Sequence, residues 1–358
     1  LNSPGGDLPF FLELARADDN LVATLINGEE RVSTTDVFFE ERDLRVAFPA
    51  FNSRIQASVE DGFLVGSMTV VRAGGSRHMM PLRATKGRTN RFSPDDPALV
   101  DMTGRWNVTF RQIDGTETPA VGEFEQSGNE LTGTFLTPTG DYRYLAGDVT
   151  GRRLRLSTFD GYHAFLFDAH LGADGVMRGD FWSGTQWHET WEATRDENAA
   201  IPDADALTYL KPGTTELNFA FPDTSGQLVS LRDERFDGKV VVVSISATWC
   251  PNCHDEAAFW APFYREYRDR GVEIVGLMYE HVPGFDSAAE QVARFAQRHG
   301  VEYPLLIAGS SEKGEAGKTL PMLNHVIAYP TTVFIDRRGR ARKIHTGFAG
   351  PGTGEHYR

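Results

Sequence analysis

The sequence predicts a two-part protein, with an all-β region over about the first 200 residues and an α/β domain over the rest. Short alternating apolar runs separated by turn signals fill residues 8–195, whereas strand-length and helix-length patterns alternate beyond residue 213. The length supports the division, because 358 residues, 40% of them apolar, are too many for one ordinary core. We therefore expect two or three globular domains.

The N-terminal region is expected to form short antiparallel strands. Alternating runs occur at Leu44–Phe48, Ile55–Val59 and Leu64–Val71. Hairpin turns are indicated by Asn27-Gly28, Asp61-Gly62 and Asp174-Gly175. Strong helix signals are scarce in this part of the chain.

This region is also duplicated, with an offset of about 110 residues between similar segments. The matching pairs are Asp43–Phe48 with Arg153–Phe159, Asp61–Ser67 with Asp174–Asp180, and Leu82–Lys86 with Trp191–Arg195. We expect β-rich repeats at 1–100 and 101–197, arranged as two small sheets or as one barrel closed across both copies. Gly104-Arg-Trp106 is similar to the first strand of lipocalin barrels.

Aromatic side chains cluster in the second copy. They are Phe159, Tyr162, Phe165, Phe167, Phe181, Trp182, Trp187 and Trp191. A ligand cavity is one interpretation, but packing between sheets is favoured because aromatic residues in strands usually lie in the core.

A linker or wrapped connection is expected at 198–212, and the α/β pattern follows it at 213–358. Strands are predicted at Val240–Ile245, Val272–Tyr279, Tyr303–Ala308, Thr331–Ile335 and Ala341–Thr346. Helices are predicted from Cys253 to about Arg270, at Ser287–His299 with Ser287 as the cap and Glu290 three residues later, and up to about Val326. This order predicts a mixed central sheet.

Composition and charge exclude some functions. The formal net charge of −14, which lies mostly in residues 1–212, leaves no basic patch for a nucleic acid. No run approaches 18 apolar residues, so no transmembrane segment is expected. The first residues have no basic or apolar leader, so a signal peptide is expected to be absent or removed.

Chemistry is expected at the only two cysteines, Cys250 and Cys253, which form a C-x-x-C pair between a buried strand and a helix. Free backbone N–H groups and the positive end of a helix stabilise a thiolate, which is the form that attacks a disulfide. Cys250 is therefore the expected nucleophile. Cys253, one turn further into the helix, is the expected resolving thiol.

Three other uses of the cysteine pair fit the sequence less well. Cys250-Pro-Asn-Cys-His254 matches a haem attachment sequence, but haem requires a largely helical domain with a distal ligand. Zinc requires two more ligands, and His281, His299, His325 and His345 have no ligand spacing. A purely structural disulfide would close too short a loop to gain much chain entropy. No metal and no cofactor other than a Cys250–Cys253 disulfide is expected.

Residues 213–358 resemble the TlpA/ResA-like branch of the thioredoxin superfamily, which consists of extracytoplasmic thiol–disulfide oxidoreductases. The matching segments are Phe221-Pro-Asp, Gly238-Lys-Val-Val-Val-Val, Ala247-Thr-Trp-Cys-Pro-Asn-Cys, Gly271-Val-Glu-Ile-Val-Gly and Tyr329-Pro-Thr-Thr-Val-Phe-Ile-Asp336. The resemblance implies a thioredoxin-like fold, a cis-proline at Pro330 that faces the dithiol, and substrate positioning by Trp249, Pro251, Tyr329, Pro330 and Thr331.

The resemblance also implies a catalytic role for Glu256, which is one helical turn beyond Cys253 and can exchange a proton with that thiol. Ordinary thioredoxins carry a buried aspartate six residues before the first cysteine. That position is Ser244 here, so another acid is required, and Glu256 is the nearest candidate.

Three features depart from the family pattern. The helix proline usual eight residues after the first cysteine is Ala258 here, and a proline follows only at Pro262. The stretch Gly309–Asn324 is longer than usual and is either part of a partner groove or a surface helix. The glycine-rich segment after Thr346 is unsuited to the usual final helix, which is therefore missing or truncated.

The sequence thus predicts an extracytoplasmic, for example periplasmic, thiol–disulfide oxidoreductase that reduces protein disulfides and receives electrons from an upstream thiol donor. The β region is expected to position, protect or recruit a partner. Two alternatives stay open. A thiol peroxidase is disfavoured because Thr248 lies two residues before Cys250 and not three. A ligand-binding β barrel with an attached redox switch is the other.

Overall fold

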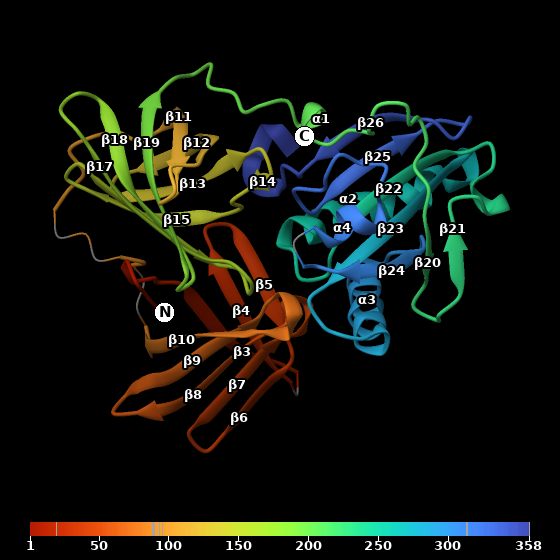
Figure 1. Ribbon diagram of the computed structural model, residues 1–358. Coiled ribbons are helices and arrows are strands. Elements are labelled where there is room, and N and C mark those ends of the chain that lie inside the picture. Colours follow the sequence, from red (N-terminus) through yellow and green to blue (C-terminus); the bar gives the residue numbers. More distant parts are fainter. Residues whose placement is uncertain (19, 88–89, 93, 95, 313, 358) are drawn as a thin grey trace.

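The computed structural model describes residues 1–18, 20–87, 90–92, 94, 96–312 and 314–357. Three parts follow one another along the chain (Figure 1). Two open sheets come first, in red and orange, then a closed barrel in yellow and green, and finally an α/β domain in teal and blue. The predicted fold class is thereby confirmed, with all-β structure preceding an α/β domain.

The first copy forms two sheets that share a core. The sheet β3-β4-β5 consists of Phe11–Ala17, Asn20–Asn27 and Glu30–Thr34. The sheet β10-β9-β8-β7-β6 consists, in chain order, of Val37–Glu40, Asp43–Phe48, Ser53–Glu60, Phe63–Val71 and Arg77–Thr85. Strands β1 (Asn2–Ser3) and β2 (Gly6–Asp7) form a separate pair. Alternate side chains such as Leu25, Leu44 and Ile55 face inward and are fully buried.

The second copy closes into a barrel on its own. Its eight strands are β11 (Gly104–Arg111), β12 (Glu117–Ser127), β13 (Glu130–Thr137), β15 (Leu145–Thr150), β16 (Arg153–Phe159), β17 (Ala164–Leu171), β18 (Val176–Ser183) and β19 (Trp187–Arg195). All neighbours are antiparallel, and pairing of β12 with β13 completes the circle. A short strand, β14 (Gly140–Asp141), extends β13. A barrel shared by both copies does not form, because β11 bridges β12 and β19 and leaves no free edge in the second copy.

The barrel interior is filled by side chains. Phe110, Phe135, Phe167, Phe181 and Trp191 are buried there and contact one another, with the Phe167 and Phe181 rings stacked at 4.5 Å. Core packing therefore explains most of the aromatic cluster, as the sequence favoured. Trp187 is an exception, since it lies outside the core and is largely exposed.

The connection between the barrel and the α/β domain packs against both of them. Ala199 is buried against Val121 and Leu136 on the outside of the barrel. Helix α1 (Ala204–Leu207) then contacts strand β26 of the α/β domain, where Asp205 pairs with His345 at 2.8 Å.

The α/β domain has the predicted mixed sheet, in the order β24-β23-β22-β25-β26. The strands in chain order are β22 (Val240–Ser246), β23 (Val272–Glu280), β24 (Leu305–Ser310), β25 (Thr331–Ile335) and β26 (Ala341–Thr346). β22, β23 and β24 are parallel, whereas β25 and β26 are antiparallel to their neighbours. Helices α2 (Pro251–Tyr267) and α3 (Phe285–His299) cover one face, and α4 (Glu315–Thr319) packs on the other. Smaller elements are β20 (Ala220–Pro222), β21 (Leu228–Ser230), and the 3-10 turns η1 (Pro49–Phe51), η2 (Ala73–Gly75), η3 (Glu234–Phe236), η4 (Arg268–Arg270) and η5 (Pro351–Tyr357).

Two predicted helix details are wrong. α3 begins two residues earlier than expected, with Gly284 at a φ of 84° as its N-cap, so Ser287 lies inside the helix and caps nothing. The helix predicted up to about Val326 is only the five residues of α4, because Pro321 follows closely and disfavours helical backbone before it. Lys313, within the long Gly309–Asn324 stretch, lies outside the described residues. Among the helices of the described part of the chain, none has the length and apolar character that a membrane crossing requires.

Candidate active site

The two cysteines lie where β22 ends and α2 begins. Cys250 is the N-cap residue of α2, and its Sγ accepts a hydrogen bond from the backbone N–H of Cys253 at 3.2 Å. Both thiols are free; Cys250 is 6% exposed and Cys253 is fully buried. The Cys250 sulfur therefore lies at the unpaired N–H groups and the positive end of the helix. The arrangement therefore suits a nucleophilic first sulfur and a shielded second one.

Cys253 is held in its protonated form. Burial raises the pKa of the Cys253 thiol well above its ordinary value, its contact with the Cys250 sulfur adds to this effect, and Ser246 opposes it. A group that removes the proton is therefore required before Cys253 can attack.

Glu256, one turn further along α2, is a buried carboxylate. Its Oε2 accepts a hydrogen bond from the Ser244 hydroxyl at 2.6 Å, and its Oε1 accepts one from the Thr332 hydroxyl. Burial raises the pKa of Glu256, and these two hydrogen bonds oppose the rise. The carboxylate thus occupies the space beside Ser244, the strand position at which ordinary thioredoxins carry an acid. The negative charge of Glu256 also contributes to the raised pKa of Cys253, so the two groups interact electrostatically.

A loop before β25 forms the second wall of the site. The Tyr329–Pro330 peptide bond is cis, and the Tyr329 carbonyl accepts a hydrogen bond from the Cys250 thiol at 3.3 Å. Thr331 follows as the first residue of β25, and its hydroxyl donates to the Ala328 carbonyl at 2.8 Å. Trp249 packs edge-on against the Tyr329 ring at 5.7 Å. These four residues, all predicted to position a substrate, are thus gathered around Cys250.

Glu280, a second buried acid that the sequence reasoning missed, holds the loop before Cys250. At the end of β23, its two carboxylate oxygens accept hydrogen bonds from the backbone N–H of Thr248 at 2.9 Å and from the Thr248 hydroxyl at 2.6 Å. Burial raises the pKa of Glu280 to about 7. Nothing in the local sequence separates this glutamate from any other residue at a strand end.

The N-terminal region holds the turn of the C-x-x-C motif directly. Arg143, in the loop after β14, donates a hydrogen bond to the Pro251 carbonyl at 3.0 Å and pairs with Asp255 on α2. The side-chain amide of Asn252 donates to the Asp141 carbonyl at 3.2 Å. Both residues between the two cysteines are therefore bound by one loop of the β region, which we call the clamp loop (residues 141–143). The expected substrate-positioning residue Pro251 is instead buried beneath it.

Arg143 is a buried cation with several acidic partners. Besides Asp255, it pairs with Glu30 at 2.6 Å and approaches Asp160 at 3.6 Å, so all three parts of the molecule meet at its guanidinium. Burial raises the pKa of Asp255 to about 7 despite the nearby charge of Arg143. Arg143 itself has a φ of 57°, in the left-handed region that few residues other than glycine adopt. Such a conformation persists where surrounding contacts determine it, as they do here.

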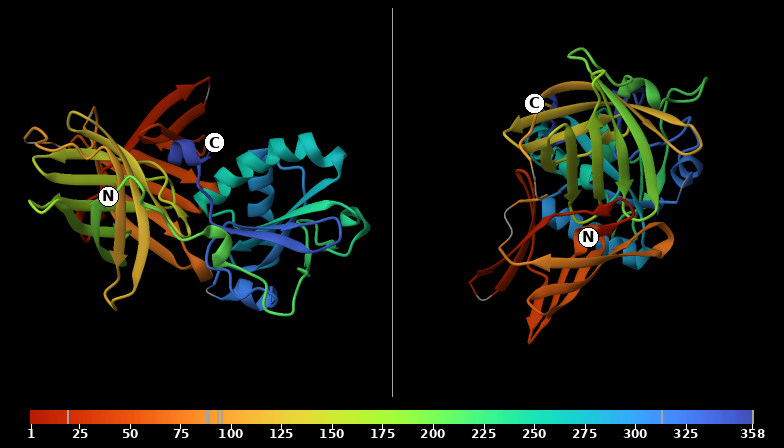
Figure 2. Two further views of the ribbon diagram at one scale, coloured as in Figure 1. Left: turned by 90° about the horizontal axis from the view of Figure 1, so that it is seen from above. Right: turned by 90° about the vertical axis from the view of Figure 1, so that its left-hand side faces the viewer.

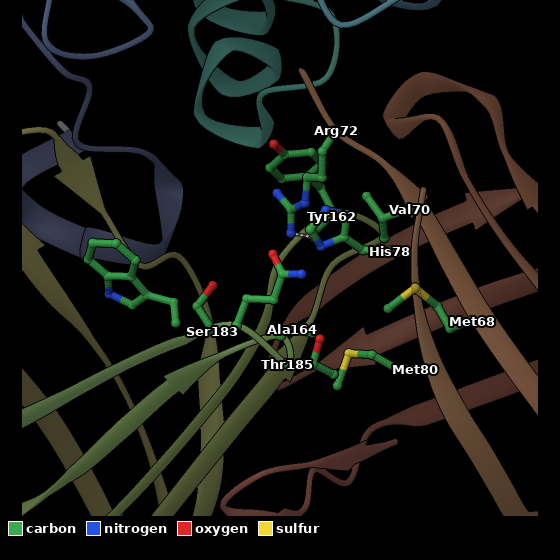
Figure 3. A pocket seen from close by; sticks show the side chains of 12 residues that line it. Met68, Val70, Arg72, His78, Met80, Tyr162, Ala164, Ser183 and Thr185 are labelled. Atoms are coloured by element: carbon green, nitrogen blue, oxygen red, sulfur yellow. Dashed lines mark hydrogen bonds between the residues drawn. The ribbon is translucent and has the colours of Figure 1, made fainter. Parts of the chain in front are cut away.

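Tyr162 of the β region packs on the residue before Cys250. It lies in the turn between β16 and β17, its ring packs against Trp249 at 5.3 Å, and its hydroxyl bonds His281 Nε2 at 2.9 Å. His281 in turn stacks on Trp249 at 4.0 Å, and burial, aided by Arg72, lowers the pKa of His281 to about 3. The Arg72 guanidinium lies over the Tyr162 ring, 4.1 Å from the ring centre (Figure 3).

The glycine-rich segment after β26 packs between the barrel and the α/β domain, as the view from above shows (Figure 2). A Cβ at Gly347 would lie 2.9 Å from the backbone of Gly140, and one at Gly350 would lie 2.6 Å from Asp255. The segment then continues into η5, where His356 contacts Glu123 of the barrel at 2.9 Å. The sequence indicated only that this segment is no helix. Gly347 permits close approach of the α/β domain to Gly140, the residue before the clamp loop.

The described residues show no group of three or more His, Cys, Asp or Glu side chains arranged for a metal ion. His254, which completes the haem-like sequence, is instead buried, with Nδ1 bonded to His299 Nε2 at 2.6 Å and Nε2 to the Thr248 carbonyl at 2.7 Å. Burial lowers the pKa of both histidines, that of His299 to about 4. Neither ring nitrogen of His254 is free for an iron or zinc ion.

Comparisons with known proteins find relatives among thiol-disulfide oxidoreductases. A family model described as Redoxin matches residues 199–356. The thiol-disulfide oxidoreductase ResA of Halalkalibacterium halodurans is 31% identical over 142 residues, which are 38% of this chain and 69% of that protein. ResA of Geobacillus thermodenitrificans is 30% identical over 140 residues, which are 39% of this chain and 72% of that protein.

Among solved structures, a thiol:disulfide interchange protein of the thioredoxin family from Chlorobium tepidum is similar to this chain. It is 20% identical, covers 40% of this chain and 92% of its own, and has a TM-score of 0.31.

Proposed function

The chain belongs to the ResA-like branch of the thioredoxin superfamily, and we propose that it reduces disulfides of protein substrates through the Cys250–Cys253 dithiol. The observation that carries the proposal is the position of Cys250. Its Sγ accepts the Cys253 N–H at the start of α2, while the thiol touches the Tyr329 carbonyl beside Pro330. The redox group is then the cysteine pair itself, with no further cofactor.

The proposed reaction has two steps. The Cys250 thiolate attacks one sulfur of the substrate disulfide, so a mixed disulfide forms and the first substrate thiolate leaves and takes up a proton. Glu256 then accepts the proton of Cys253, whose sulfur attacks Cys250 Sγ and releases the second substrate thiol. Two electrons pass from the dithiol to the substrate, and the enzyme is left with a Cys250–Cys253 disulfide. An external dithiol donor restores the reduced form.

Reduction is the proposed direction, and an extracytoplasmic compartment is the proposed location. Both rest on the resemblance to extracytoplasmic oxidoreductases and on the ResA relatives at about 30% identity. The reduction potential of the pair, measured against glutathione buffers, tests the direction. A reductase must lie above its thiol donor and below its substrates, so a potential above that of the substrate disulfides would indicate an oxidase. Fractionation of source cells tests the location, and recovery of the protein with cytoplasmic proteins would contradict it.

Trapping tests the mechanism. We expect Cys253→Ser to accumulate mixed disulfides between Cys250 and substrate proteins, because the resolving thiol is gone. Cys250→Ser, which retains the buried thiol, is the matched control and is expected to trap nothing. Adducts are separated on non-reducing gels and identified by mass spectrometry. If neither variant traps a protein, and the wild type does not reduce insulin or hydroxyethyl disulfide, the proposed function is wrong.

The rival role of the barrel as a ligand container gains no support, because its interior is occupied by Phe110, Phe135, Phe167, Phe181 and Trp191. No second function is therefore proposed for the barrel interior.

A further inference from the structure

A cavity of about 400 Å³ lies between the first copy and the barrel, and Tyr162 is one of the residues that line it (Figure 3). Strands β9 and β10 supply Met68 and Met80 on one side. The turn with Tyr162 and the hairpin between β18 and β19 supply the other. The volume is within the range of ligand pockets in proteins, about 300–1,000 Å³.

The charge of the cavity is opposite to that of the protein. The whole chain carries 50 acidic residues against 36 Lys and Arg. Yet the described residues that line the cavity include none that is acidic, and two, Arg72 and His78, that are basic. Such a local reversal of sign attracts an anionic group.

Arg72 is oriented to bind a carboxylate. Its guanidinium lies on the Tyr162 ring and donates to the Tyr162 carbonyl at 3.4 Å. Within the described part of the chain, no Asp or Glu forms an ion pair with it. A guanidinium has five N–H donors, and stacking on a ring keeps the fork in one orientation, so donors remain for a bidentate carboxylate.

The floor of the cavity suits an apolar side chain. Met68 and Met80 are almost fully buried, and thioether side chains adapt to irregular apolar partners. Trp187, which also lines the cavity, is 47% exposed and offers an aromatic edge at its mouth. The cavity therefore combines a cation with apolar surface, which a segment with adjacent acidic and apolar residues would fill.

The position of the cavity connects it with the dithiol. Tyr162 lines the cavity and also packs on Trp249, which immediately precedes Cys250. The Arg72 guanidinium is 4.1 Å from the Tyr162 ring, and that ring is 5.3 Å from the ring of Trp249. A polypeptide advances about 3.3 Å per residue when extended, so a few residues of a substrate bridge this distance. The clamp loop meanwhile covers Pro251 and Asn252, so substrate contacts on that side of the dithiol are blocked.

Building on the proposed function, we propose that this cavity recognises an acidic–apolar segment of the substrate polypeptide, close to its reactive cysteine. An Asp or Glu carboxylate pairs with Arg72, and a neighbouring apolar side chain packs on Met68 and Met80. The β region is then the part of the enzyme that selects substrates, and Tyr162 separates the recognition site from the reacting sulfurs.

Paired peptides test the proposal. Each peptide carries one cysteine as a mixed disulfide with cysteamine and a Leu–Glu or Leu–Gln pair four residues away. For the wild type we expect kcat/KM to be about tenfold higher for the glutamate peptide, chiefly through KM, which corresponds to one favourable charge contact. Raising NaCl from about 0.05 M to about 0.5 M should reduce that preference.

Variants assign the preference to one residue. Arg72→Gln is expected to abolish the ratio between the two peptides, and Arg72→Lys to restore part of it. Arg83→Gln is the matched control, because Arg83 also stacks on an aromatic ring of the same sheet, 3.7 Å from Phe63, but does not line the cavity. It is expected to keep the wild-type ratio. A ratio near one in the wild type, or a wild-type ratio in Arg72→Gln, overturns the proposal.

Two further outcomes keep this inference separate from the proposed function. Turnover of hydroxyethyl disulfide without any peptide preference would leave the oxidoreductase intact and remove the recognition site. Saturable binding of decanoate that is lost in Arg72→Gln, with no peptide preference, would assign the cavity to a free carboxylate ligand and overturn the peptide proposal. Absence of turnover with every disulfide would instead contradict the proposed function.

Discussion

At the scale of single residues, the site separates the roles of the two sulfurs through their surroundings. Cys250 has helix N–H groups at its sulfur, whereas Cys253 is enclosed and its thiol pKa is raised. The proton on Cys253 therefore controls the second half of the proposed reaction, and Glu256 is the buried carboxylate that responds to it.

Glu256→Gln is expected to slow resolution of the mixed disulfide. The amide can still accept from Ser244 but cannot take the Cys253 proton, and positioned acid–base groups contribute about 10²- to 10⁴-fold to such steps. Single-turnover kinetics should show a fast first step and an accumulating mixed disulfide, with a rate that continues to rise with pH where the wild-type rate levels off. Glu290→Gln, on the exposed face of α3, is the control. Equal resolution rates in wild type and Glu256→Gln would exclude the proton-transfer role.

His281 predicts a dependence of stability on pH. Its folded-state pKa is lowered to about 3 by burial and Arg72, against about 6.5 in an unfolded chain. The unfolded state thus binds more protons between these values, so the contribution of His281 is full above pH 6.5 and is lost as pH falls towards 3. His281→Gln should lower the slope of the unfolding free energy in this window by up to about 1.4 kcal/mol per pH unit. Urea denaturation at several pH values measures it, and parallel profiles for the two proteins would contradict the assignment.

At the scale of secondary-structure elements, strands were predictable and their ends less so. Val240–Ile245 and Ala341–Thr346 appear as predicted, because a β-branched run or an alternating pattern carries its own periodicity. The predicted start of a helix depended on the choice of a single capping residue. The N-cap of α3 is Gly284 and not Ser287, so the helix begins two residues earlier than predicted. The glycine-rich segment after β26 was predicted to be unsuited to the usual final helix, and its end forms the 3-10 turn η5. Its packing against the clamp loop was unpredictable, because the matching surface is about 200 residues away in sequence.

Gly347→Ala tests whether that segment is packed as closely as the backbone indicates. Both Gly347 and Gly339 have positive φ, 81° and 77°, so alanine at either site costs about 1–2 kcal/mol from the backbone alone. Only at Gly347 does the new Cβ meet another backbone, at 2.9 Å, whereas nothing lies within 4 Å at Gly339. The extra destabilisation of Gly347→Ala over Gly339→Ala should be about 1–3 kcal/mol in urea denaturation. Equal losses would show that the segment yields without cost.

At the scale of the whole molecule, the two parts were predictable separately but not together. The dithiol, Glu256 and the Tyr329–Thr331 loop belong to one domain, and their motifs identify them locally. The contacts that complete the site join distant residues, such as Arg143 with Pro251, 108 positions apart, and Tyr162 with His281, 119 positions apart. No periodicity or spacing marks Arg143 or Tyr162. The β region, which was expected to position, protect or recruit a partner, therefore also contacts the turn between the two cysteines.

Arg143→Gln is expected to weaken the contact between the β region and the α/β domain and to expose Cys250. It removes the bond to Pro251 and leaves the buried Glu30 carboxylate without this ion-pair partner, a loss that costs about 3–5 kcal/mol in buried pairs. Asp160 keeps its contact with His163 at 2.9 Å. Iodoacetamide should therefore alkylate Cys250 of the reduced variant at least about tenfold faster than in the wild type, a ratio that corresponds to about 1.4 kcal/mol of easier opening. Asp255→Asn removes one partner from the other side and should fall between the two. Arg153→Gln breaks only an exposed barrel ion pair with Asp168 and should leave the rate unchanged. Since Cys250 is 6% exposed while the parts are docked, equal alkylation in all four proteins would mean that docking does not limit access, and that Arg143 holds the β region in place without controlling the dithiol.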